Sequence, residues 1–96
     1  MPRRILDRIR AAIRSAAYDM TVHAVEEMAE ENLDLVDVET AILNGRLIKT
    51  GKVEPRGTRY TVHGIATDGS TPVGTVGRFI ETGRYLIITV YEVTEP

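Results

Sequence analysis

The stretch YLIITVYEV, residues 85–93, decides the fold. It is the part of the chain richest in β-branched and aromatic residues, and no Gly or Pro interrupts it, which predicts a β-strand. Strict alternation places Leu86, Ile88 and Val90 on one wholly aliphatic face. The other face then mixes apolar bodies with hydroxyl groups and consists of Tyr85, Ile87, Thr89 and Tyr91. We therefore expect a central strand that packs on one side and lines a groove on the other.

Further strands are expected before this one, because the hydrophobic period changes to two from Arg46 onward. The predicted strands are 46–53, 59–67, 73–80 and 85–92. The turns between them are short and contain Gly, which favours antiparallel neighbours in a meander. Gly64 lies within the second of these strands and indicates a bulge or a close approach of another backbone.

Helices are expected in the first half of the chain. Residues 3–17 form an amphipathic pattern with an arginine-rich surface, a second helix begins at the N-cap Thr21, and a third runs from Asp34 to Gly45. In the second helix we expect a buried stripe of Val22, Val25, Met28 and Ala29. The predicted fold is α+β: two or three N-terminal helices packed on a four-stranded, mainly antiparallel sheet.

Composition fits one ordinary globular domain over residues 1–96, in which a basic helix (1–17) precedes a core (18–93). The chain has no cysteine, so disulfides and thiolate metal sites are excluded. No apolar run approaches the ~20 residues that cross a bilayer. The first twenty residues lack the apolar segment of a secretory signal. We expect a cytoplasmic protein with no membrane partner.

Charge is unevenly distributed along the chain, although the net charge is only −2. Residues 1–18 carry five arginines and one Asp, whereas residues 19–39 carry eight acids and no Lys or Arg. Residues 40–96 are weakly basic, with seven bases and five acids. This pattern argues against a uniformly basic nucleic-acid-binding protein, but it permits a local basic groove.

The polar residues that best suggest chemistry are His23, Arg59, His63, Thr89 and Tyr91. If the register brings them to one face, they supply the parts for cleaving RNA by its own 2′-hydroxyl. An imidazole (His23 or His63) would be the base, Arg59 would stabilise charge, and Tyr91 would position the substrate or act as an acid. The chain contains no nucleotide-binding loop or metal-ligand motif, so we expect chemistry without a cofactor or metal.

A structural interpretation of the same residues is also open. His23 then contacts a helix start, Arg59 is a solvated edge residue, and Tyr91 is a half-buried strand tyrosine. The chain would be a non-catalytic interaction module. Its N-terminal helix or an exposed strand edge would bind a second copy or another protein.

Four segments together resemble a known bacterial family: MTVHAVEEM, DLVDVETAILNGRLIK, RGTRYTVHG and YLIITVYE. The shared marks are His23, Ala24, Glu26, Met28, Gly45, Arg59, Gly64 and the final Thr89-Val90-Tyr91. The pattern covers residues 18–93 and resembles the domain of unknown function four-two-five-eight. That family is similar to RelE-like and BrnT-like toxins. The resemblance implies an mRNA-cleaving toxin paired with an antitoxin-like protein, and it favours His23 over His63 as the imidazole.

Overall fold

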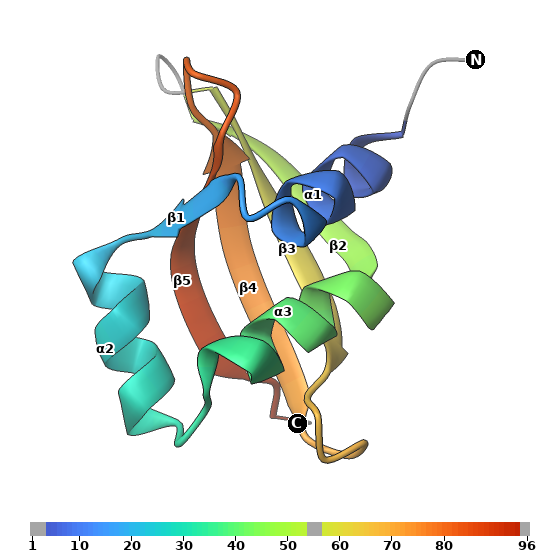
Figure 1. Cartoon of the computed structure of the whole chain (residues 1–96), viewed down its shortest axis with the longest axis vertical. Coiled ribbons are helices and arrows are strands. Elements are labelled where there is room, and N and C mark those ends of the chain that lie inside the picture. Colours follow the sequence, from blue (N-terminus) through green and yellow to red (C-terminus); the bar gives the residue numbers. More distant parts are fainter. Residues whose placement is uncertain (1–3, 54–56, 95–96) are drawn as a thin grey trace.

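One mixed sheet and three helices make up the computed structural model, which describes residues 4–53 and 57–94 (Figure 1). The helices and strands follow one another in the order α1 (Ile5–Arg14), β1 (Tyr18–Met20), α2 (Val22–Glu30), α3 (Leu35–Asn44), β2 (Arg46–Val53), β3 (Gly57–Ile65), β4 (Pro72–Phe79) and β5 (Tyr85–Glu92). The α+β prediction and its three helices are confirmed. No helix within these ranges has the length and apolar character to cross a bilayer.

The sheet has the strand order β1-β5-β4-β3-β2, and β2 to β5 form the expected antiparallel meander. The prediction of four strands is wrong, because Tyr18–Met20 adds a fifth strand parallel to β5. Three residues are too few to produce an alternation signal. The first helix also ends earlier than predicted, at Arg14. Ala16 then takes a φ of 58°, a left-handed conformation that turns the chain away from the helix.

The alternation predicted for residues 85–93 is wrong as well, because β5 contains a bulge. Val76 of β4 pairs with Thr89, but the next residue, Gly77, pairs with Ile87, so that Ile88 has no direct partner. One extra residue reverses the faces of every side chain beyond it. Tyr85 and Ile87 therefore face the helices and are fully buried, whereas Thr89 and Tyr91 face the opposite side.

The core lies between the sheet and two helices, α1 and α3, which cross the same face (Figure 1). Helical spacing explains this packing, because Ile9 and Ile13 of α1 and Val38 and Ile42 of α3 are all buried. From the sheet, the largest buried contribution is Tyr85, whose ring lies against Gly77 and edge-on to Phe79. The apolar stripe of α1 is thus buried in the core of the molecule.

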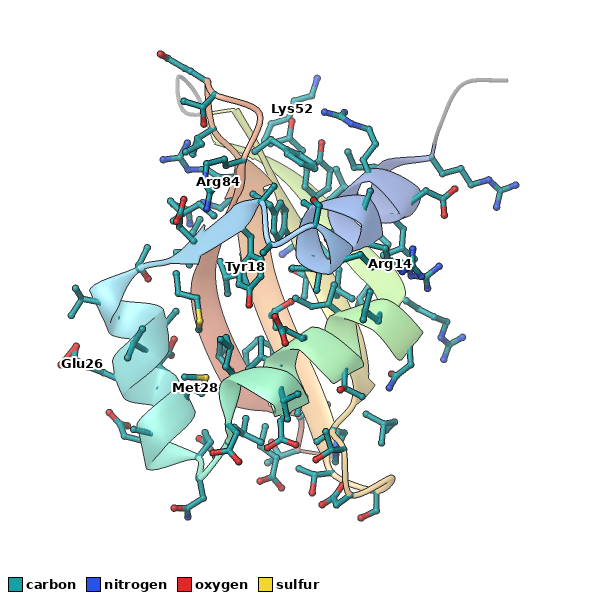
Figure 2. The ribbon with its side chains drawn as sticks, in the orientation of Figure 1. Arg14, Tyr18, Glu26, Met28, Lys52 and Arg84 are labelled. Atoms are coloured by element: carbon teal, nitrogen blue, oxygen red, sulfur yellow. The ribbon has the colours of Figure 1, made fainter. Side chains whose placement is uncertain are left out.

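Helix α2 lies along the edge of β5, beyond the point where β1 ends (Figure 1). Its contact face is Ala24, Glu27 and Met28, and Figure 2 shows Met28 directed toward the sheet and Glu26 away from it. The predicted stripe is wrong at Val22, Val25 and Ala29, all of which are exposed. Hydrophobic spacing alone could not reveal that a carboxylate, Glu27, belongs to the buried side.

The C-terminal end of α3 approaches the backbone of β3 closely. The Asn44 side-chain amide accepts a hydrogen bond from Ile65 N–H and donates one to Ile65 C=O, both at 2.8 Å. A Cβ on Gly64 would lie only 1.8 Å from the carbonyl oxygen of Ala41. Gly64 therefore marks a close backbone approach, one of the two alternatives expected from the sequence.

Replacing Gly64 by Ala is expected to lower the free energy of unfolding by roughly 3 kcal/mol or more, because the obstacle is backbone that cannot rotate away. Gly51→Ala is the matched control: Gly51 also lies in a strand, and its Cβ would meet nothing within 4 Å. Without a clash, alanine should stabilise the strand by about 0.5–1 kcal/mol. Urea unfolding measures both, and equal effects would contradict this account of Gly64.

Candidate functional site

In the part of the chain that the structure describes, no helix covers the face of the sheet opposite α1 and α3, and we call this side the open face. Register decides which side chains point there. Gly74 pairs with His63 on one side and with Tyr91 on the other, and Val76 pairs in the same way with Thr61 and Thr89. The outward positions of β2 to β5 are Arg46, Lys49, Gly51, Arg59, Thr61, His63, Gly74, Val76, Arg78, Leu86, Thr89 and Tyr91. Four of the five residues proposed from the sequence therefore share one face.

His63 and Tyr91 are in direct contact across β4. The Tyr91 hydroxyl lies 2.7 Å from His63 Nε2, and the two rings meet edge to face with their centroids 5.6 Å apart. Gly74 makes this contact possible, because a Cβ there would lie 2.3 Å from the Tyr91 ring. Burial raises the pKa of Tyr91 above its ordinary value, so the phenol is protonated at neutral pH. The pair thus joins a phenol hydroxyl to an imidazole, and the tautomer of His63 decides which of the two donates the hydrogen bond.

Arg59 lies on the same face but not in the same contact. It is four residues before His63 on β3, which places the two Cα atoms about 13 Å apart. Arg59 lines a pocket of about 260 Å³ together with Lys49, Gly51, Thr61 and Val76. Thr89 lies between the two groups, in the row of Thr61 and Val76. The site consequently has two parts, the His63–Tyr91 pair and the Arg59 pocket.

His23 stands apart from these four residues. Its side chain is 66% exposed in the first turn of α2, and its Nε2 lies 3.3 Å from Glu27 Oε2. The other carboxylate oxygen of Glu27 accepts a hydrogen bond from Val90 N–H at 3.0 Å. Within residues 4–53 and 57–94, no hydrogen bond joins His23 to Arg59, His63, Thr89 or Tyr91. The imidazole on the open face is that of His63.

Three cations on the open face were not predicted from the sequence. Register places Arg46 directly beside His63 and Lys49 beside Thr61, and Arg78 follows the Gly77 that pairs with Tyr60. Regular alternation would place Arg46 and Lys49 on opposite faces of β2, and the bulge between Leu47 and Lys49 brings them to the same face. None of the outward positions named above on β2 to β5 is acidic. The open face is therefore basic in a protein whose net charge is −2.

The acids of residues 19–39 lie on other surfaces, mainly on α2 and α3. Asp19, at the margin beside Leu86, is neutralised by Arg84, whose Nε lies 2.8 Å from its carboxylate. That hydrogen bond lowers the pKa of Asp19. In the described ranges, no three His, Asp or Glu side chains gather closely enough to hold a metal ion. The chemistry of the open face has to be sought in its own hydroxyl, imidazole and cationic groups.

Comparison with protein-family models matches residues 20–92 to the family described as a domain of unknown function, DUF4258. The match covers α2, α3 and β2 to β5 with the last residue of β1, so it includes the four strands whose outward positions form the open face. Neither curated proteins nor solved structures gave a match.

Tyr91→Phe should remove the hydroxyl that contacts His63 and leave the aromatic ring in place over Gly74. We expect a loss of about 0.5–1.5 kcal/mol in the free energy of unfolding, the usual value of one hydrogen bond. Nitrogen-15 NMR of the His63 ring should show a changed tautomer ratio, because its Nε2 loses a partner. An unchanged His63 spectrum would mean that the two side chains are not bonded in solution.

Glu27→Ala should leave the Val90 amide without its acceptor at the edge of β5. We expect a loss of about 1–3 kcal/mol in the free energy of unfolding and faster hydrogen exchange at Val90. Glu26→Ala is the matched control, because Glu26 is an exposed carboxylate on the same helix and points away from the sheet (Figure 2). That control should change stability by less than about 0.5 kcal/mol. Similar exchange at Val90 in both variants would contradict the role given to Glu27.

Proposed function

We propose that this chain, which belongs to the DUF4258 family, binds RNA on the open face and cleaves it as a toxin related to the RelE-like and BrnT-like toxins. The observation that carries the proposal is the 2.7 Å contact between His63 and Tyr91 on a helix-free, basic face. A face of this kind accepts an extended polyanion, and the pair supplies groups that exchange protons with it.

Cleavage begins with removal of the proton from a ribose 2′-hydroxyl. In the tautomer that carries its proton on Nε2, His63 donates to the Tyr91 oxygen and keeps Nδ1 free as an acceptor. Nδ1 takes the 2′-hydroxyl proton, and the 2′-oxygen attacks the adjacent phosphorus. Arg46, the neighbour of His63 on β2, is placed to stabilise the negative charge that develops on the phosphoryl oxygens.

The leaving 5′-oxygen needs a proton as its bond to phosphorus breaks. Tyr91 donates its hydroxyl proton, and His63 restores it by passing the Nε2 proton across their hydrogen bond. The phenol of Tyr91 carries its proton at neutral pH, since burial raises its pKa further above its ordinary value. The products are a 2′,3′-cyclic phosphate and a free 5′-hydroxyl, and His63 ends neutral with its proton on Nδ1. No external acid, metal or cofactor enters this balance.

His63→Ala is expected to lower the rate of RNA cleavage by roughly 100-fold or more, the usual contribution of one general acid–base group. The assay follows a single-stranded RNA by gel electrophoresis and identifies the cyclic phosphate at the new 3′ end. Expression of the wild-type chain should slow bacterial growth, and His63→Ala should relieve that effect.

His23→Ala provides the matched control, since it removes the exposed imidazole on α2. It should retain activity within about threefold, because His23 makes its contact with Glu27 at the edge of β5. Intact RNA in the presence of wild-type protein would end the ribonuclease proposal. A loss with His23→Ala equal to that with His63→Ala would reassign the imidazole.

A non-catalytic interaction module is the second candidate, supported by the exposed stripe on α2. Val22 is 77% exposed and Val25 46% exposed, and neighbouring Glu26 and Glu30 make the rim of the stripe acidic. Such a stripe suits an antitoxin-like protein that presents an apolar, basic helix. A double variant, Val22→Asp with Val25→Asp, would release that protein in size-exclusion chromatography, and intact RNA in the presence of the wild-type chain would favour this candidate over the ribonuclease. The outer edge of β2 is the corresponding surface for a second copy of the chain.

A further inference from the structure

The pocket beside Arg59 is built from three strands. Gly51 and Thr61 are small residues on neighbouring strands, Val76 forms an apolar wall on β4, and Lys49 and Arg59 contribute the cations. Its volume of about 260 Å³ lies below the roughly 300–1,000 Å³ usual for drug-sized ligands. The pocket is therefore large enough for one phosphate with part of its sugar, but not for a large cofactor.

One polar atom of a residue that lines the pocket has no hydrogen-bond partner among the residues that the structure describes. The Nε of Arg59 is buried and makes no hydrogen bond to any described residue. Arg59 lines the pocket, and an anionic oxygen is the acceptor with which a guanidinium makes its strongest hydrogen bonds. No ion pair with a carboxylate joins Lys49 or Arg59 within residues 4–53 and 57–94. The Thr61 hydroxyl adds a donor at the same place.

We propose that this pocket binds a second RNA phosphate, one that flanks the phosphate attacked beside His63. The inference rests on the function proposed above and adds a substrate requirement to it. The Cα atoms of Arg59 and His63 are about 13 Å apart along β3. Arg59 lines a pocket whose lining does not include His63, so a phosphate in that pocket is a different one from the phosphate beside His63. The ligand that reaches both is an oligonucleotide running along β3, with Thr61 between its two phosphates. Arg59 is thus a substrate-positioning residue.

Short DNA oligomers test this subsite without cleavage, because they lack the 2′-hydroxyl. We would measure the binding of two oligothymidylates by fluorescence titration: a dinucleotide with one phosphate and a tetranucleotide with three. The wild-type chain should bind the tetranucleotide roughly tenfold more tightly than the dinucleotide, as expected for one further charge-assisted contact. Arg59→Gln should abolish this difference by weakening the tetranucleotide alone, and Lys49→Gln should reduce it.

Arg14→Gln makes the same change of charge on α1, away from the open face, and should leave the difference within about twofold (Figure 2). Equal weakening of both oligomers by Arg59→Gln, or no weakening, would overturn the subsite. The RNA assay separates the two proposals. A tetranucleotide preference that depends on Arg59 in a protein that cannot cleave RNA would support the subsite and refute the catalysis. Cleavage by a protein without that preference would refute the subsite and leave the catalysis.

Discussion

The bulge at Ile88 is the constraint on which the two sides of this sheet depend. Ahead of it, Tyr85 and Ile87 face the helices and fill the core, whereas beyond it Thr89 and Tyr91 face outward. In a regular strand Tyr85 and Tyr91 would point to the same side, since they are six residues apart. One strand could not then supply both the largest buried side chain of the core and the phenol of the open face.

Two glycines of β4 complete this arrangement. Gly77 leaves room for the ring of Tyr85 on the helix side, and Gly74 leaves room for the ring of Tyr91 on the open side. Each tyrosine can therefore lie across β4. Tyr85 meets Phe79 edge-on, and Tyr91 reaches His63. Glycine weakens a strand by about 0.5–1 kcal/mol relative to alanine, and the packing of a large ring against the bare backbone offsets that cost.

Helix α2 packs along the edge of β5 beyond Ile87, where β1 no longer pairs with this strand. The Thr21 hydroxyl donates to Ile88 C=O, and Glu27 accepts from Val90 N–H, so backbone groups on both sides of Thr89 are satisfied by side chains. Unpaired backbone groups at a sheet edge promote association with other chains, and the hydrogen bonds from Thr21 and Glu27 satisfy two such groups here. The acids that accompany Glu27 on α2 stay at the edge and on the helix surface, which leaves the open face basic.

The sequence by itself determined the local features. Thr21 begins α2, Gly45 follows the end of α3, and the meander from residue 46 onward lies where its turns predicted. These signals act over a few residues, so a single chain segment contains them completely.

Only the tertiary structure decided how those elements combine. The strand at Tyr18–Met20 exists because β5 is available to pair with it, and the bulges of β2 and β5 are defined by their partner strands. The separation of His23 from His63 followed from the same cause. A pattern of alternation specifies which residues share a face of one strand, but cross-strand pairing decides which faces coincide. That pairing joins residues far apart in the chain, such as His63 and Tyr91, and no short stretch of sequence encodes it.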